Sequence, residues 1–304
     1  MIRRKIATIS LMLIGICLLV YPVVATFMGN LNGVEIAREQ IHEMNKKTEE
    51  GGKAEQEEKL QAARDYNSNI LGVPILDPYL HRMTDQGTEE YQTYLSILHD
   101  SKDGIMGRLI VPKGKIDLPI RHGTDDDSIA RGVGHLFGTG MPVGGKGNNS
   151  VLTAHSGLTT MSLFDGLRDV KIGDFIYVQT EGETLAWKVR EINVIDPYQL
   201  DLFKPKEDED LVTLFTCTPY GVNTHRLVVT GERVALEDTP REDLKEPTWV
   251  NAFRVWMIAP PIIITVTIAT ATIIVKRNKK RANSEEVNED NRTCDGKHSF
   301  VGSN

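Results

Sequence analysis

The sequence predicts a mainly β fold, a β-barrel with short helices, held between two membrane helices. Between residues 105 and 236, short runs of apolar and β-branched residues alternate with turns rich in glycine, proline and aspartate, and helix signals there are few. Two stretches without charged residues, 6–28 and 255–275, flank this region, and each is long enough to cross a hydrocarbon core of ~30 Å. We therefore expect an exported barrel between two spans.

The first span, residues 6–28, follows the basic residues Arg3, Arg4 and Lys5. A cleaved signal peptide is the alternative, because the small residues at 23–25 could form a cleavage site. The apolar stretch is longer than the usual signal-peptide core of about 7 to 15 residues. We favour an uncleaved anchor.

The second span, residues 255–275, lies between Arg254 and a basic run that begins at Lys276. Both basic clusters lie outside the loop that joins the spans. The positive-inside rule therefore predicts a two-pass protein of the cell membrane with both termini in the cytoplasm. Pro260 and Pro261 are expected to kink this helix, which a membrane tolerates.

The exported segment before the barrel, residues 29–104, is expected to be largely helical. From Glu35 to Asn67 helix-forming residues dominate and large apolar residues are sparse, which predicts a solvated helix broken at Gly51 and Gly52. A shorter helix is expected over Tyr91–Leu98. This segment is interpreted as a spacer between the membrane and the barrel.

The last hairpin of the barrel carries the residues best suited to chemistry. Leu211–Cys217 and His225–Gly231 are typical of buried strands, and a Thr-Pro-Tyr-Gly turn lies between them. Cys217 thus ends one strand near the point where Arg226 begins the next. Because a guanidinium stays charged at physiological pH, Arg226 can lower the pKa of the thiol or stabilise an oxyanion on an attacked carbonyl.

A base is available upstream, where the apolar run Ser150–Ala154 ends at His155. A cysteine, a histidine and an arginine at strand tips can carry out nucleophilic acyl transfer. The chain has eight histidines. His122 and His135 lie in glycine-flanked turns, and His225 is expected to point to the opposite face of its strand from its arginine neighbour. We therefore assign the base to His155.

The predicted topology makes the three cysteines informative. Cys17 lies in the first span and Cys294 in the cytoplasmic tail, which leaves Cys217 alone outside. A lone exported thiol cannot form an internal disulfide, so it is either a small buried hydrophobe or a reactive group. With a histidine and an arginine at hand, we interpret it as a nucleophile.

Around these residues the chain reads TAHSG, TLFTCTPYG and NTHRL, which resembles the sortases, the cysteine transpeptidases of Gram-positive cell surfaces. The likeness covers roughly Gly107–Val234. It implies a closed barrel and a reaction that needs no cofactor and no metal, because a thioester conserves the energy of the cleaved bond. It also implies that Cys217 attacks the Thr-Gly bond of an LPXTG-like sorting signal, His155 transfers protons and Arg226 stabilises the oxyanion.

An upstream segment, GVPILDPYLHRM, resembles the pilus-type, or class C, sortases, in which a DPx tripeptide forms a lid over the active site. By this resemblance the lid is Asp77, Pro78 and Tyr79. Asp77 is then expected to pair with Arg226, and the Tyr79 ring to cover the thiol. An ordinary Asx-Pro turn is the alternative. A second copy, Asp196–Tyr198, lies inside the barrel sequence and is interpreted as structural.

The resemblance also implies partners. These are surface or pilin proteins with an LPXTG-like signal, an acceptor lysine amine of a pilin subunit, and the lipid bilayer. Nucleic acid is not expected, since the net charge is −7. Thr216, Thr218 and the loop Asp196–Asp210 are expected to shape the peptide groove.

Other functions were weighed against this one. A housekeeping sortase that attaches proteins to peptidoglycan and a non-catalytic, membrane-held assembly scaffold are the alternatives. L,D-transpeptidases are also β-rich with histidine before cysteine, but their cysteine follows a glycine, whereas Thr216 precedes Cys217. The chain is not itself sortase cargo, because no LPXTG-like pentapeptide precedes residue 255.

Two further patterns are interpreted as structural. Gly132–Gly147 is glycine-rich but lacks the lysine-serine pair and helix of a phosphate-binding loop. The acids at 125–127 are consecutive and lack the alternate spacing of a calcium loop, which favours a turn or helix cap. The predicted boundaries are a cytoplasmic N-terminus 1–5, a membrane helix 6–28, an exported segment 29–104 with the lid 77–79, a catalytic barrel 105–236, an acidic linker 237–254, a membrane helix 255–275 and a cytoplasmic tail 276–304.

Overall fold

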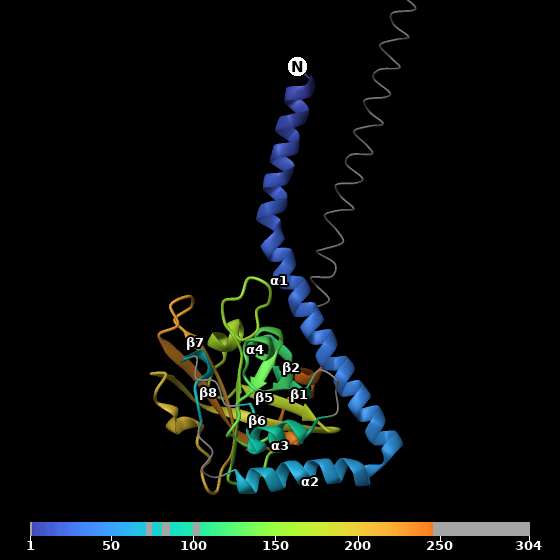
Figure 1. Cartoon of the computed structure of the whole chain (residues 1–304), viewed down its shortest axis with the longest axis vertical. Coiled ribbons are helices and arrows are strands. Elements are labelled where there is room, and N and C mark those ends of the chain that lie inside the picture. Colours follow the sequence, from blue (N-terminus) through green and yellow to red (C-terminus); the bar gives the residue numbers. More distant parts are fainter. Residues whose placement is uncertain (1, 71–74, 81–85, 100–103, 246–304) are drawn as a thin grey trace, which may run out of the picture. The chain divides into compact units, whose positions relative to one another are not determined.

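The computed structural model describes residues 2–70, 75–80, 86–99 and 104–245 (Figure 1). The predicted second span and the cytoplasmic tail lie outside the described residues. The α-helices are α1 (Ile2–Gly51), α2 (Lys53–Asn69), α3 (Glu89–Ser96) and α4 (Asp126–Arg131). The strands are β1 (Ile105–Val111), β2 (Ile116–His122), β3 (Val133–His135), β4 (Asn148–Thr153), β5 (Phe175–Thr180), β6 (Glu183–Ile195), β7 (Asp210–Thr218) and β8 (His225–Val234). Short 3₁₀ helices are η1 (Pro78–Leu80), η2 (Asp165–Asp169), η3 (Leu200–Phe203), η4 (Leu236–Asp238) and η5 (Arg241–Leu244).

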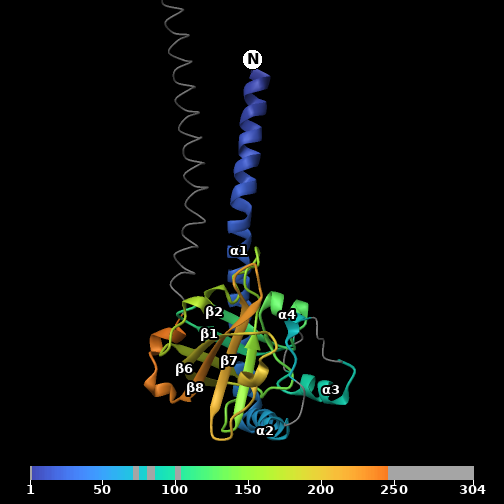
Figure 2. The ribbon, with the colours of Figure 1, turned by 90° about the vertical axis from the view of Figure 1, so that its left-hand side faces the viewer.

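The eight strands close into a barrel in the order β1-β2-β3-β4-β7-β8-β6-β5 (Figures 1 and 2). Neighbours are antiparallel except for β2 with β3 and β4 with β7, which run parallel. The pairing of β1 with β5 completes the closure, so these two strands are not left with the exposed edges that invite aggregation. The predicted mainly β, closed barrel is confirmed.

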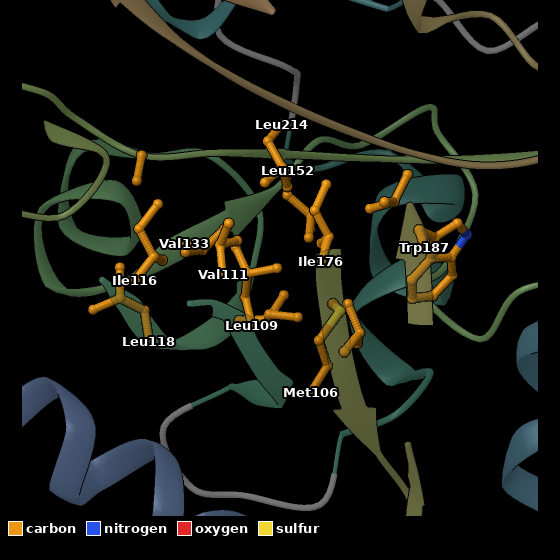
Figure 3. Close-up of a cluster of buried hydrophobic side chains, with 14 of the residues drawn as sticks. Met106, Leu109, Val111, Ile116, Leu118, Val133, Leu152, Ile176, Trp187 and Leu214 are labelled. Atoms are coloured by element: carbon orange, nitrogen blue, oxygen red, sulfur yellow. The ribbon is translucent and has the colours of Figure 1, made fainter. Parts of the chain in front are cut away.

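The barrel interior is filled from alternate strand positions, as the pleat requires. On β7, Val212 and Leu214 point into the main core, whereas Phe215 belongs to a separate cluster on the outer face. Cys217, two residues beyond Phe215, shares that outer face. Figure 3 shows interior side chains from several strands, namely Met106, Leu109, Val111, Ile116, Leu118, Val133, Leu152, Ile176, Trp187 and Leu214.

Helix α1 is continuous from Ile2 to Gly51, so the predicted first span runs directly into the exported segment. The helix ends at Gly51. Gly52 follows with a φ of 85°, which lies in the left-handed region that glycine adopts without steric cost, and α2 begins at Lys53. The predicted break is confirmed. Among the described residues, the helical stretch Ile14–Lys47 meets the length and hydropathy expected of a membrane span.

The part of α1 beyond the predicted span is not a free solvated spacer, because it packs against β1 and β2 (Figure 1). One stripe of the helix is buried, consisting of Val34, Ala37, Ile41 and Met44. Arg38 of α1 also lies 3.5 Å from the carboxylate of Asp117, which Arg108 binds with two nitrogens at 2.6 and 2.7 Å. This part of α1 therefore belongs to the barrel structure.

The start of the predicted acidic linker also docks on the barrel. Leu236 and Leu244, in η4 and η5, pack on an outer cluster around Tyr177, and the Tyr177 hydroxyl donates to Asp243 at 2.9 Å. As far as Lys245 the chain is thus part of the folded unit. Elsewhere Asp125 caps α4 by accepting from the main-chain amides of residues 127 and 128, which agrees with the predicted cap.

Candidate active site

The hairpin of β7 and β8 brings the predicted cysteine and arginine together. Strands β7 and β8 lie side by side (Figure 2), and Cys217 lies directly opposite Arg226 in their register. Both side chains are on the outer face, and their exposed fractions are 8% for Cys217 and 2% for Arg226. A thiol and a guanidinium are therefore held side by side and away from bulk water.

His155 reaches the same place through the parallel pairing of β4 with β7. Thr153 is the register partner of Phe215, so His155 comes level with Cys217 two residues further along. Hydrogen bonds extend this alignment beyond the strand: the Thr216 hydroxyl donates to the carbonyl of residue 154 at 2.8 Å, and the hydroxyl of residue 156 donates to the carbonyl of Cys217 at 3.0 Å. Neighbouring strands lie about 4.8 Å apart. Cys217 on β7 is therefore flanked by Arg226 on β8 and by His155, which lies two residues beyond the end of β4.

The surface around these residues is apolar. An outer cluster on the same face consists of Leu136, Val151, Ile195, Phe203, Phe215 and Val228, with Ile75, Tyr79, Leu200 and Leu202 packed against it. Strands β4, β6, β7 and β8 and the 3₁₀ helix η3 each supply residues to this cluster. The loop that contains η3 was expected to shape a groove, and its leucines and phenylalanine do pack beside the site.

Thr216 does not belong to this surface. It is buried on the face that looks into the barrel, where its hydroxyl bonds to the main chain of β4. The expectation that Thr216 lines a groove was wrong, because the alternation that points Cys217 outward points its neighbour inward. Thr153 on the outer face was missed from the sequence. Its hydroxyl donates to the carbonyl of Phe215 at 2.8 Å and lies 2.9 Å from the hydroxyl of Tyr79.

The segment Asp77–Tyr79 lies on the site. Arg226 binds the carboxylate of Asp77 with two nitrogens, Nε at 2.7 Å and Nη2 at 3.2 Å, and Asp77 is fully buried. The ring of Tyr79 lies 5.5 Å from the ring of His155 and 5.2 Å from the guanidinium carbon of Arg226. Tyr79 thus contacts both residues that flank Cys217, and the expected ion pair between Asp77 and Arg226 is present.

The second copy of the tripeptide, Asp196–Tyr198, forms the same local turn in a different setting. In each copy the aspartate accepts from the amide of the tyrosine, at 2.8 Å for Tyr79 and 2.9 Å for Tyr198. However, Tyr198 is 66% exposed. A side chain so exposed contributes little packing, and the interpretation of this copy as structural stays a prediction.

Burial controls the protonation of the site. It raises the pKa of the Cys217 thiol to about 11; Arg226 lowers this pKa and Asp77 raises it. Burial also lowers the pKa of His155. Because burial disfavours both charged forms, the Cys217 thiol and the His155 imidazole are neutral at neutral pH while Asp77–Tyr79 stays in place.

The other candidate histidines have structural roles. His122 and His135 are the last residues of β2 and β3, not turn residues, and both are buried. The Nε2 atom of His135 donates to the carbonyl of Gly140 at 2.8 Å, and burial lowers the pKa of His135 to about 4. His225 is exposed beside the buried Arg226, which agrees with the predicted alternation. In the described part of the chain, no group of three or more histidine, cysteine, aspartate or glutamate residues could hold a metal.

Known proteins share this architecture. A family model of the sortase domain matches residues 109–234. Sortase A from Corynebacterium diphtheriae is 39% identical, with a TM-score of 0.61, over 68% of this chain and 97% of that one. Sortase C-1 from Actinomyces oris is 46% identical, with a TM-score of 0.57, over 60% of this chain and 99% of that one. For Streptococcus pneumoniae sortase C, whose structure was solved with regard to pilin substrate specificity, the identity is 32%, the TM-score 0.57 and the coverage 65% and 97%.

Curated relatives match over a shorter span. Sortase A of Streptococcus agalactiae is 26% identical over 152 residues, which are 49% of this chain and 60% of that protein. Because identity of 39% extends over 97% of a solved sortase, the chain belongs to the sortase family of cysteine transpeptidases.

Proposed function

We propose that the protein is a membrane-anchored sortase of the pilus type. It cleaves an LPXTG-like sorting signal between threonine and glycine and joins the threonine carbonyl to a lysine amine of a pilin subunit. The observation that carries this proposal is the position of Cys217 between Arg226 and His155. The segment Asp77–Tyr79 lies over these residues, and its aspartate is bound to Arg226. His155, Cys217 and Arg226 are the catalytic residues, and Asp77, Pro78 and Tyr79 are the lid.

The reaction follows from the roles that these groups can play. His155 takes the thiol proton, and the sulfur of Cys217 attacks the threonine carbonyl carbon. Arg226 stabilises the negative charge that forms on the carbonyl oxygen. When the tetrahedral intermediate collapses, the carbon-nitrogen bond breaks, and His155 returns the proton to the departing glycine amine.

The second half of the reaction reverses these steps with a new amine. The lysine nitrogen attacks the thioester, His155 removes a proton from it, and the Cys217 sulfur leaves as the amide bond forms. The free energy of the original peptide bond is retained in the thioester, so no nucleotide is consumed.

The lid must move before this reaction begins. In the closed state Asp77 uses two nitrogens of Arg226, which are the donors that the oxyanion needs. Burial also keeps the thiol protonated, and only the thiolate is a strong nucleophile. The closed lid therefore protects an idle thiol and withholds both the nucleophile and the oxyanion donor.

A housekeeping sortase that acts on peptidoglycan is the second candidate. It is favoured by the matches to sortase A proteins of Corynebacterium diphtheriae and Streptococcus agalactiae. The lid, the Thr-Pro-Tyr-Gly turn after Cys217, the second predicted span and the similarity to the sortase C proteins favour the pilus type. The acceptor amine distinguishes the two.

The thioester is the expected signature of the proposed reaction. When the full-length chain in detergent is incubated with a peptide that carries an LPXTG signal, mass spectrometry should find the acyl fragment on Cys217. A pilin peptide with a lysine should then release it more efficiently than an oligoglycine amine. An acyl group on any other residue, or none on a chain that remains folded, would contradict the proposed mechanism. Faster release by oligoglycine would favour the housekeeping candidate.

The proposed two-pass topology has a separate test. A reporter fused after Asn304 is expected to behave as cytoplasmic, and one inserted near Lys245 as exported, because the basic clusters lie only at the outer flanks of the two spans. Enzymatic reporters that are active on only one side of the membrane measure this directly. An exported C-terminus would reject the two-pass arrangement and leave the assignment of the barrel unchanged.

A further inference from the structure

The outer end of the membrane helix is bonded to the loop that follows His155. On α1, Asn30 makes a reciprocal pair of hydrogen bonds with Ser162: the main-chain amide of Ser162 donates to Oδ1 at 2.8 Å, and Nδ2 donates to the Ser162 hydroxyl at 3.0 Å. One turn earlier, the Thr26 hydroxyl donates to the carbonyl of Thr159 at 2.6 Å. The loop is thus held at two points by residues at the end of the predicted span.

The helix and the loop are also in very close contact. A Cβ atom on Gly29 would lie 2.0 Å from the carbonyl oxygen of Thr160, and one on Gly33 would lie 2.2 Å from the end of the Met161 side chain. Gly29 and Gly33 are four residues apart and so lie on one helix face, where small residues allow a backbone to approach. This close contact goes beyond what a helix that only tethers the barrel to a membrane requires.

The loop transmits this attachment to His155 through its own hydrogen bonds. The amide of Phe164 donates to the carbonyl of His155 at 3.0 Å, and the amide of Asp165 donates to the carbonyl of Ser162 at 2.7 Å. The Asp165 carboxylate in turn accepts from the amide of Gly157 at 2.7 Å. These hydrogen bonds therefore close residues 155–165 into a loop, and Asn30 binds this loop at Ser162.

We propose that Asn30 is a positioning residue that fixes the position of His155 beside Cys217. The membrane helix then contributes to the geometry of the active site. The inference rests on the proposed function, because that function gives His155 its role in proton transfer. A misplacement of a reacting group by about 1 Å can cost on the order of 100-fold in rate. Loss of the two hydrogen bonds between Asn30 and Ser162 is therefore expected to slow the reaction while leaving the peptide surface on β7 and β8 intact.

The test uses the full-length chain in detergent micelles or lipid vesicles and the transpeptidation of a sorting peptide. Asn30→Leu removes both hydrogen bonds at similar volume and is expected to lower kcat about tenfold or more, with KM changed less than about twofold. Asn30→Asp keeps an acceptor for the Ser162 amide and is expected to recover kcat to within about threefold of the original chain. Asn32→Leu is the matched control, because Asn32 is an exposed asparagine on the same helix.

The pH profile separates positioning from stability. If His155 has shifted, the limb of the kcat/KM profile that reports its protonation should move in Asn30→Leu and return in Asn30→Asp. A kcat within about twofold of the original in Asn30→Leu, or an equal loss in Asn32→Leu, overturns the proposal. So does a lowered kcat with an unmoved pH profile, which would indicate a role in stability alone.

Two further variants keep the result decisive. If Asn30→Leu does not fold, Ser162→Ala serves in its place, because it removes the hydrogen bond to the Ser162 hydroxyl and keeps the one from the Ser162 amide. A lowered kcat with a moved limb of the pH profile in Ser162→Ala supports the proposal. An unchanged kcat and pH profile overturn it. Cys217→Ala tests the underlying function in the same assay. An active Cys217→Ala rejects the proposed function itself, whereas an inactive Cys217→Ala beside an unaffected Asn30→Leu rejects only the role of Asn30.

Discussion

Replacing Cys217, His155 or Arg226 with alanine, one at a time, is expected to abolish transpeptidation and leave the barrel folded. The three side chains act in one sequence of steps, so each single loss should lower kcat/KM by about 1,000-fold or more, and double losses should cost little beyond that. Product formation followed by mass spectrometry measures the rate, and thermal unfolding by circular dichroism measures the fold.

The arginine needs a second variant, because Arg226→Ala also leaves the buried carboxylate of Asp77 without its partner, and an unpaired buried charge destabilises a protein. Arg226→Lys keeps the charge but cannot reproduce the two-nitrogen geometry, so it should fold and still be severely impaired. His225→Ala is the matched control, since this histidine adjoins Arg226 and is exposed. Efficient peptide joining by any of the three alanine variants would reject the catalytic assignment.

The juxtaposition of Cys217 and Arg226 could be predicted from the sequence because it is local. Two β-branched runs with a turn between them specify a hairpin, and the residues next to the turn on the two strands must then lie opposite each other. The position of His155 needed more than local information, because β4 and β7 pair in parallel and a long stretch of chain separates them. The sequence offered His155 as a base at the tip of a strand, and the resemblance to the sortases added the expectation that it acts together with Cys217.

The docking of α1 was missed because its apolar stripe is thin. Val34, Ala37, Ile41 and Met44 are buried at helical spacing, but they stand among many charged residues. Toward the N-terminus the close contact is made by Gly29 and Gly33, and glycine contributes almost nothing to an apolar pattern. The segment therefore resembled a solvated spacer. Strand β3 was missed for a similar reason, since Val133–His135 is too short to show an alternation and lies in a glycine-rich stretch.

The two copies of Asp-Pro-Tyr show where local sequence stops being informative. Both fold into the same turn with the same aspartate-to-amide hydrogen bond. What differs is that the carboxylate of Asp77 also binds Arg226. Tertiary context, and not the tripeptide, therefore makes one copy a candidate lid.

Opening this lid is expected to make Cys217 reactive. Asp77→Ala combined with Tyr79→Ala removes the carboxylate that raises the thiol pKa and the ring that contacts both of its neighbours, and no catalytic group is lost. With a pKa of about 11 the thiol has only about one thiolate in 10,000 molecules at pH 7, whereas an accessible thiol near its ordinary pKa has a few per cent. Alkylation of Cys217 by iodoacetamide, followed by mass spectrometry, should therefore speed up by about tenfold or more at pH 7.

The pH dependence of alkylation gives the same prediction a second measurement. In the original chain the rate should keep rising with pH toward about 11, because burial raises the thiol pKa, and in the lid variant the midpoint should fall to lower pH. Asp196→Ala combined with Tyr198→Ala is the matched control, since it removes an identical turn from an exposed place and should leave both the rate and the fold unchanged. Faster alkylation in the Asp196 and Tyr198 variant, with no change in the Asp77 and Tyr79 variant, would show that the lid had been assigned to the wrong copy. Acceleration confined to the Asp77 and Tyr79 variant would instead establish that the contacts around Arg226 keep the thiol idle.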